Sequence, residues 1–196
     1  ESNKVLSDIY AKIYSEYQEA TQSGNSALLA DIERRADSVQ TEMLKNQNSP
    51  EKLAALLYPD QPPYRTKGRG DMLYDGTKKA IDILNRNRKG FFLMIEGSQI
   101  DWAAHANEAE TTIDETLDFD RVIGAALDFA KADGNTLVVI TADHETGGVT
   151  ILGGDIKSKQ AKLNFSTKSH SAVMLPVYAF GPGAGNFTGI YDNTDI

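Results

Sequence analysis

The sequence contains no cysteine among its 196 residues. Disulfide bonds and zinc–thiolate centres are therefore excluded, so any metal site in this chain must use histidine, aspartate or glutamate as ligands. The lack of cysteine is compatible with both the cytoplasm and the periplasm and does not distinguish them.

Long apolar runs are also lacking. No segment approaches the roughly 18 consecutive apolar residues of a membrane-spanning helix, so no membrane span is expected. The chain begins at Glu1 rather than Met, without a charged-then-apolar leader. This beginning is compatible with a removed signal peptide and with a piece of a longer protein.

Basic residues are in the minority. Twenty Lys and Arg against 28 Asp and Glu give a net charge of −8. Without a basic stripe to neutralise backbone phosphates, nucleic acid is disfavoured as a partner. The same acidic surplus repels any anionic substrate unless bound cations reverse the charge locally.

Short apolar runs alternate with helical patterns in the C-terminal two thirds. The runs at 90–95, 136–141 and 173–180 are typical of buried strands. Helical periodicity predicts helices over 72–87 and 111–131. This alternation predicts an α/β fold with a largely parallel sheet flanked by helices, and its chemistry is expected at the carboxyl ends of the strands.

The first 70 residues have a helical pattern of their own. Apolar spacing predicts a helix over 3–21, a second helix from Asn25 or Ser26 to about Asn46, and a short helix over 50–57. We therefore predict two parts, listed here by residue number: a helical segment over 1–70, interpreted as an insertion or peripheral element, and a catalytic-domain part over 71–196.

The first cluster of candidate metal ligands follows the run at 90–95. Glu96 ends that run, and Asp101 and His105 share one helix face if the next segment is helical. A carboxylate and an imidazole placed in this way can reach one Zn²⁺, at roughly 2.0–2.2 Å each. Taken alone, the same residues also fit a helix-start acid and a surface histidine.

Two further candidates lie beside the other runs. Asp143 and His144 follow the run at 136–141, where a turn in the chain lets both side chains face one crevice. The alternative is a strand-end turn with the aspartate as a cap. His170 precedes the last run, and by itself it would be an ordinary surface or core histidine.

All three histidines of the chain lie beside predicted strand ends. Nitrogen and oxygen ligands without sulfur suit zinc sites with open positions, and carboxylates suit Mg²⁺. We therefore predict that six side chains converge on divalent cations: Asp101, His105 and His170 on one zinc, Asp143 and His144 on a second, and Glu96 on a neighbouring hard cation.

The amino-acid sequences of these clusters closely resemble motifs of the alkaline phosphatases. The resemblance is carried by Glu-Gly-Ser-Gln-Ile-Asp-Trp-Ala-Ala-His-Ala at 96–106, by Thr-Ala-Asp-His-Glu-Thr-Gly-Gly at 141–148, and by His170 with Tyr-Ala-Phe-Gly-Pro-Gly at 178–183. It covers residues 71–196. The resemblance implies two Zn²⁺ ions and one Mg²⁺ ion per active site, with the six side chains named above among their ligands.

By the same resemblance, the chain belongs to a hydrolase of phosphate monoesters that releases inorganic phosphate. A periplasmic or secreted location and a homodimer are implied by family likeness only. Trp102 occupies a position beside the metal site where family members vary. Thr146 stands where some members carry a further histidine that supports a zinc ligand, so this supporting contact does not carry over by residue type.

The nucleophilic serine of the family, in an Asp-Ser-Ala context, has no counterpart in this sequence. Asp37 and Ser38 are followed by Val-Gln-Thr-Glu and fit a solvated helix face, and Ser98 and Ser171 lack the motif. The family's phosphate-clamping arginine also has no obvious counterpart. We therefore expect a piece of a longer enzyme, inactive by itself, with the nucleophile upstream.

Two alternatives stay open. Another member of the wider superfamily, such as a phosphodiesterase or a phosphomutase, would share scattered Asp and His ligands. The sequence motif at 96–101 nevertheless favours a monoesterase. A catalytically inactive metal-binding or interaction domain is the alternative from a different class. An Asp-Ser-Ala motif upstream of Glu1 would favour the enzyme over this second alternative.

Overall fold

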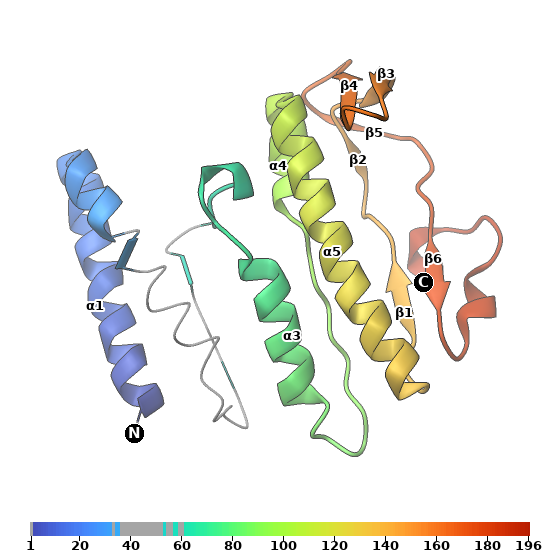
Figure 1. Ribbon diagram of the computed structural model, residues 1–196, viewed down its shortest axis with the longest axis horizontal. Coiled ribbons are helices and arrows are strands. Elements are labelled where there is room, and N and C mark those ends of the chain that lie inside the picture. The colour runs from blue at the N-terminus through green and yellow to red at the C-terminus, as the bar shows by residue number, and fades with distance from the viewer. Residues whose placement is uncertain (1, 33, 36–52, 54–56, 59–60) are drawn as a thin grey trace. The chain divides into compact units, whose positions relative to one another are not determined.

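The computed structural model describes residues 2–32, 34, 35, 53, 57, 58 and 61–196 (Figure 1). The chain divides into two compact units, each formed by two segments: Glu1–Pro63 with Lys79–Phe91, and Tyr64–Lys78 with Phe92–Ile196. The division predicted from the sequence at residue 70 stays a prediction.

The first unit begins with helix α1 (Ser2–Ser23), close to the predicted range. Gly24 leaves the helix with φ +66°, and the Asn25 side chain accepts a hydrogen bond from the Leu28 backbone N–H at 3.1 Å. This contact caps the helical residues 26–32, as the sequence predicts. A small core packs α1 against the helical residues 26–32, formed by Ile13, Ala20 and Ile32 with Tyr17 and Leu29 beside them.

Several predictions for the N-terminal segment lie outside the described residues. They are the continuation of the second helix beyond residue 35, most of the short helix over 50–57, and the environment of Asp37 and Ser38. These stay predictions.

Three further helices follow: α3 (Met72–Leu84), α4 (Gln99–Ala106) and α5 (Ala109–Asp133). The helices predicted over 72–87 and 111–131 are thus confirmed: α3 begins at the predicted residue and ends three residues earlier, and α5 extends two residues further at each end. Asn107 takes a left-handed conformation with φ +61° and ends α4, so that the chain turns directly into α5. Helices α4 and α5 pack against each other, and the small buried side chains Ala103 and Ala104 of α4 allow a close approach.

The strands form three antiparallel pairs in the described part of the chain: β1 (Val138–Ile140) with β6 (Tyr178–Phe180), β2 (Glu145–Thr146) with β5 (His170–Ser171), and β3 (Thr150–Asp155) with β4 (Gln160–Asn164). Single-turn helices lie at Arg65–Lys67, Ala184–Phe187 and Asn193–Asp195. Of the run predicted over 173–180, only residues 178–180 form a strand; Pro176, just before it, has no N–H to donate to a ladder.

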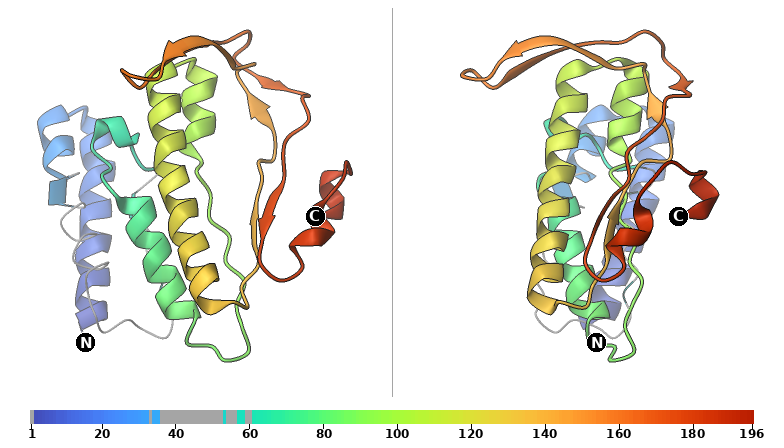
Figure 2. Two further views of the ribbon diagram at one scale, coloured as in Figure 1. Left: turned by 45° about the vertical axis from the view of Figure 1, so that its right-hand side comes forward. Right: turned by 90° about the vertical axis from the view of Figure 1, so that its right-hand side faces the viewer.

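The predicted first strand needs a correction. Residues 91–95 form no ladder within the described part of the chain, although residues 92–95 run in the same direction as β1 (Figures 1 and 2). The side chains alternate in exposure, with Phe92 87% and Met94 76% exposed. The apolar pattern therefore gives an extended segment, but a strand also needs a hydrogen-bonded neighbour, and the parallel neighbour is not among the described pairs.

Within the second unit, a buried ionic cluster attaches the loop that precedes α3 to helix α5. Arg69 contacts Glu115 at 2.5 Å and Asp118 at 3.1 Å, and all three side chains are almost fully buried. At the exposed end of the cluster, Arg121 donates to Asp71 at 2.8 Å. Buried charges are tolerated only when they are paired in this way, so this loop and α5 form one structural element.

No helix within the described ranges is long and apolar enough to cross a membrane.

Candidate metal centre

Helix α4 supplies the first two side chains of the candidate site. Asp101 and His105 lie one turn apart on one face, as predicted, with Asp101 Oδ1 3.5 Å from His105 Nε2. The backbone carbonyl of Lys168 lies 2.6 Å from His105 Nδ1. Because a carbonyl only accepts, Nδ1 donates a proton to it, and in the neutral ring the lone pair then lies on Nε2, which faces Asp101.

The third side chain comes from β5. His170 Nε2 lies 3.1 Å from His105 Nε2 and 3.8 Å from Asp101 Oδ1. Two ligand atoms of a four-coordinate zinc, each about 2.05 Å from the metal, lie roughly 3.3 Å apart. The three separations between these atoms therefore match the spacing of a shared cation closely enough to fit one.

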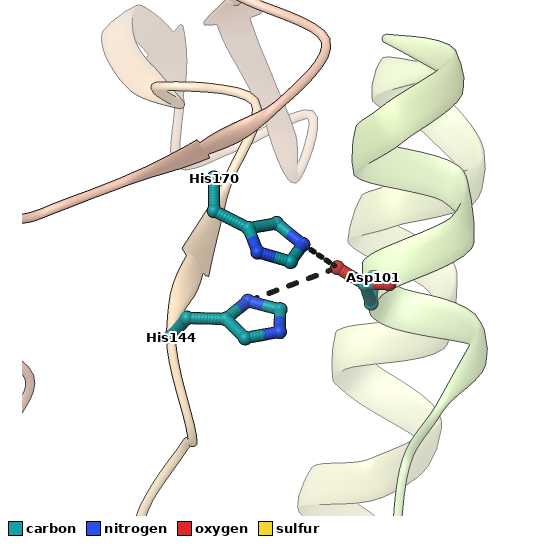
Figure 3. A group of neighbouring side chains, drawn as sticks. All are labelled: Asp101, His144 and His170. Atoms are coloured by element: carbon teal, nitrogen blue, oxygen red, sulfur yellow. Dashed lines mark ion pairs between the residues drawn. The ribbon is translucent and has the colours of Figure 1, made fainter.

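His144 joins the same group from the chain before β2. Its ring stacks on the His170 ring with 3.5 Å between the ring centres, and its Nδ1 lies 3.9 Å from Asp101 Oδ1. Figure 3 shows both imidazoles pointing at the Asp101 carboxylate across the space between the strands and α4. One ligand atom from each of these three residues lies within 4.8 Å of the others.

The two other predicted ligands lie differently. Asp143 Oδ2 is 3.1 Å from His144 Nε2, and the Asp143 side chain is 86% exposed. Asp143 therefore contacts the His144 nitrogen other than the one that faces Asp101. Glu96 is exposed at the end of the extended segment, and no hydrogen bond or ion pair in the described part of the chain joins its side chain to the other five.

A glycine turn brings the histidine-bearing strands against α4. Gly147 has φ +89°, its N–H donates to the Ser169 carbonyl at 3.0 Å, and its carbonyl accepts from Ser166 and Thr167. A Cβ at this position would lie 3.0 Å from the Ala104 carbonyl oxygen of α4. Only glycine combines this backbone conformation with this close approach to the helix that carries Asp101.

Thr146 contacts and supports the Asp101 carboxylate. The sequence did not predict this contact, because some family members have a histidine at this position. The Thr146 side chain is buried, its hydroxyl donates to Asp101 Oδ1, and Thr146 Oγ1 lies 3.1 Å from His144 Nδ1. Thr146 also lies opposite His170 in the β2–β5 pair. The Thr146 hydroxyl therefore contacts two of the candidate ligands, Asp101 and His144, and the Thr146 backbone pairs with a third.

Glu145 has a structural role that the sequence did not predict. Its carboxylate accepts hydrogen bonds from the Ser171 hydroxyl and from the backbone N–H groups of Gly148 at 3.2 Å and Val149 at 2.9 Å. Burial acts to raise the pKa of the Glu145 carboxyl, but these hydrogen bonds and the nearby His144 outweigh burial and lower the pKa. The one available sequence signal was an acidic residue between His144 and a glycine turn.

The structure thus defines a class: an α/β protein in which imidazoles and carboxylates from helix α4, strand β5 and the segment before β2 gather as a candidate zinc-type centre. The sequence profile of the alkaline phosphatase family matches residues 32–160. This match spans more than half of the chain, and the chain belongs to the alkaline phosphatase family. It begins within the predicted N-terminal segment, whereas the quoted motifs begin after residue 71.

Individual relatives agree with the family match. The chain is 44% identical over 124 residues to alkaline phosphatase 4 of Bacillus subtilis, covering 63% of this chain and 27% of that protein. The solved alkaline phosphatase of the Antarctic bacterium TAB5 has a TM-score of 0.71 and 44% identity, with 78% of this chain and 46% of that chain covered. A mutant of the TAB5 enzyme, described with Mg bound in its M3 site, has a TM-score of 0.63 and 47% identity, with 68% and 41% covered.

Two consequences follow from these similarities. The α/β class predicted from the sequence and the resemblance to the alkaline phosphatases are both confirmed. The chain spans about a quarter to a half of the length of these relatives.

Proposed function

We propose that this chain is part of a metal-dependent phosphate monoester hydrolase, an alkaline phosphatase, and carries most of its metal ligands. The observation that carries the proposal is the convergence of Asp101, His105 and His170, whose ligand atoms lie 3.1–3.8 Å apart. His144 and Asp143 extend the same group towards a second cation.

The donor set fits zinc. Imidazole nitrogens and carboxylate oxygens without sulfur are the ligands of zinc sites that keep open positions. When bound, such cations polarise phosphoryl oxygens, lower the pKa of bound water to about 7 and offset the acidic charge of the chain. We assign the two zinc ions to the groups around Asp101 and Asp143, and one magnesium ion to Glu96 with ligands from outside this chain. The TAB5 mutant described with Mg in its M3 site supports a magnesium position.

The residues of this chain then have distinct tasks. Asp101 offers one carboxylate oxygen to the group, held by the Thr146 hydroxyl. The Lys168 carbonyl fixes His105 in the tautomer that presents the Nε2 lone pair. Asp143 presents its exposed carboxylate beside the His144 nitrogen that faces away from Asp101, as a ligand for the second zinc.

We further propose that the remainder of the enzyme supplies the nucleophile and the phosphate-binding arginine, so that this chain alone is inactive. The partial coverage of the relatives supports this proposal. The exposed Phe92 and Met94 support it as well, because large apolar side chains in an extended segment are usually covered in a complete fold. Family likeness alone supports an exported homodimer and an N-terminal segment that is an insertion.

The test uses the full-length protein that carries this chain and p-nitrophenyl phosphate as substrate. We expect Asp101→Ala and His170→Ala each to lower turnover at least about a hundredfold, because each removes a ligand rather than a supporting contact. Asp155→Ala, in the β3–β4 hairpin, is the matched control and should leave turnover unchanged. Near-normal turnover of the two ligand variants would contradict the proposal.

Rates on phosphate diesters separate this proposal from a phosphodiesterase, since a monoesterase should be much slower on them. Zinc binding without turnover of either substrate class would favour the inactive metal-binding alternative.

A further inference from the structure

We propose that Glu145 is a positioning residue, which with Ser171 fixes His144 and His170 relative to each other before a cation binds. The inference rests on the proposed function, because it concerns the same candidate centre. It starts from a carboxylate that contacts none of the candidate ligand atoms directly, yet accepts three hydrogen bonds from two separate chain segments.

Glu145 connects β5, which carries His170, with β2, which begins directly after His144. It follows His144 directly, and it pairs across the β2–β5 ladder with Ser171, which follows His170. The hydroxyl of Ser171 donates to the Glu145 carboxylate, so the backbone pairing is reinforced by a side-chain bond to a charged acceptor. A shift of either strand breaks this bond, so the bond holds the relative position of His144 and His170.

The same carboxylate also fixes the turn that follows β2. The N–H groups of Gly148 and Val149 donate to the two Glu145 oxygens, which closes the turn after Gly147. This turn is the part of the chain that approaches the Ala104 carbonyl of α4. Glu145 therefore restricts β2 on the side of β5 and on the side of α4 at once.

The two residues of β2, Glu145 and Thr146, support different candidate ligands. Successive side chains of a strand point to opposite faces, so Glu145 faces Ser171 and the turn while Thr146 faces Asp101. Two adjacent residues thus hold the ligands that lie on α4, on β5 and directly before β2. Ligands that are already in place lose less conformational freedom when a cation binds, and the affinity for the cation rises accordingly.

A purely local role in the turn is the competing explanation, and the chain offers a matched control for it. Asp155 also accepts a backbone hydrogen bond in a turn, from the Lys157 N–H at 2.8 Å in the β3–β4 hairpin, and it joins no ligand-bearing strands. If Glu145 acted only as a turn acceptor, replacing Asp155 and replacing Glu145 would have similar consequences.

The experiment measures zinc affinity of the full-length protein by competition with a chromogenic chelator. We expect Glu145→Ala to weaken zinc binding about 10–100-fold, the usual effect of removing a group that orients a ligand. Ser171→Ala should weaken it less, because two of the three donors remain, and Ser171→Thr, which keeps the hydroxyl, should bind zinc like the wild type. Asp155→Ala should bind zinc like the wild type. Wild-type affinity of Glu145→Ala, or an equal loss in Asp155→Ala, would overturn the inference.

Hydrogen exchange of the metal-free protein provides a readout that does not depend on the proposed function. The Gly147 N–H, bonded to the Ser169 carbonyl, does not contact Glu145. Its exchange should become about tenfold faster in Glu145→Ala and stay unchanged in Asp155→Ala, because the opening of the β2–β5 pair becomes easier. A wild-type protein without zinc affinity would contradict the proposed function, whereas unchanged Gly147 exchange in Glu145→Ala would overturn the positioning role.

Discussion

The Nε2 atoms of His105 and His170 face each other at 3.1 Å, although 65 residues separate the two histidines in the sequence. His105 Nδ1 is committed to the Lys168 carbonyl, so its Nε2 offers a lone pair. A proton on His170 or a cation between the rings makes this approach favourable. With Asp101 Oδ1 at 3.5 and 3.8 Å from the two nitrogens, a cation satisfies all three groups at once.

The hydroxyl of Thr146 can be tested with an isosteric change. Thr146→Val keeps the shape and removes the donor to Asp101 Oδ1, so zinc affinity should fall roughly tenfold or more. Thr146→Ser keeps the hydroxyl and should bind zinc nearly as well as the wild type. Equal affinity of the valine and serine variants would show that the hydroxyl does not support Asp101.

Replacing Gly147 should separate the strands from α4. A Cβ there would lie 2.8 Å from Phe165 and 3.0 Å from the Ala104 carbonyl, and the residue has a left-handed backbone. We expect Gly147→Ala to lower the free energy of unfolding by about 1–3 kcal/mol and to weaken zinc binding. Gly124→Ala, at an open position inside α5, should instead raise stability by up to about 1 kcal/mol. Chemical denaturation and zinc titration of both variants check this, and an unperturbed Gly147→Ala protein would contradict the described turn.

Breaking the buried ionic cluster should be costly. Arg69→Met removes the guanidinium that the buried carboxylates of Glu115 and Asp118 share. Because Arg65 still contacts both carboxylates, the cost should lie near the lower end of about 3–5 kcal/mol. Arg88→Met, at an exposed position, is the control and should be nearly neutral. Urea unfolding of the two variants measures the difference. A loss below 1 kcal/mol for Arg69→Met, as a rough threshold, would mean that the cluster is not buried as described.

The pair of Asp71 and Arg121 predicts a pH dependence. The hydrogen bond from Arg121 lowers the pKa of the Asp71 carboxyl from its ordinary 3.8, against a smaller opposing effect of burial. Because the folded state favours the ionised form, the pair stabilises the protein above the ordinary pKa and loses this contribution as the pH falls through the lower, folded pKa. The difference in Tm between the wild type and Asp71→Asn should therefore be present at neutral pH and vanish in acid.

High salt should also reduce the Asp71→Asn difference, since both side chains are substantially exposed. A Tm difference that is the same at neutral pH and below the folded pKa would rule out the ion pair as its source.

Helical spacing made part of the site predictable. Asp101 and His105 are four residues apart, and a period of 3.6 residues places them on one face once the segment is helical. The long amphipathic pattern of α5 similarly gave its position to within two residues at each end. Such local regularities need no knowledge of the rest of the fold.

Pairing between distant segments was not predictable in the same way. Strands β2 and β5 have two residues each, too few for any periodicity, and they are set opposite each other by the turn at Gly147. The contacts of Glu145 and Thr146 depend on that pairing, so their tasks could not be read from residue types. Residues 91–95 show the converse case, in which alternation predicts an extended chain but not the identity of its hydrogen-bonded neighbour.

Anomalous diffraction at the zinc absorption edge, from crystals of the full-length protein loaded with zinc, tests the central claim most directly. The account predicts a peak roughly 2.0–2.2 Å from the Asp101 carboxylate and from Nε2 of both His105 and His170. A zinc peak elsewhere, with these three side chains free of metal, would contradict it.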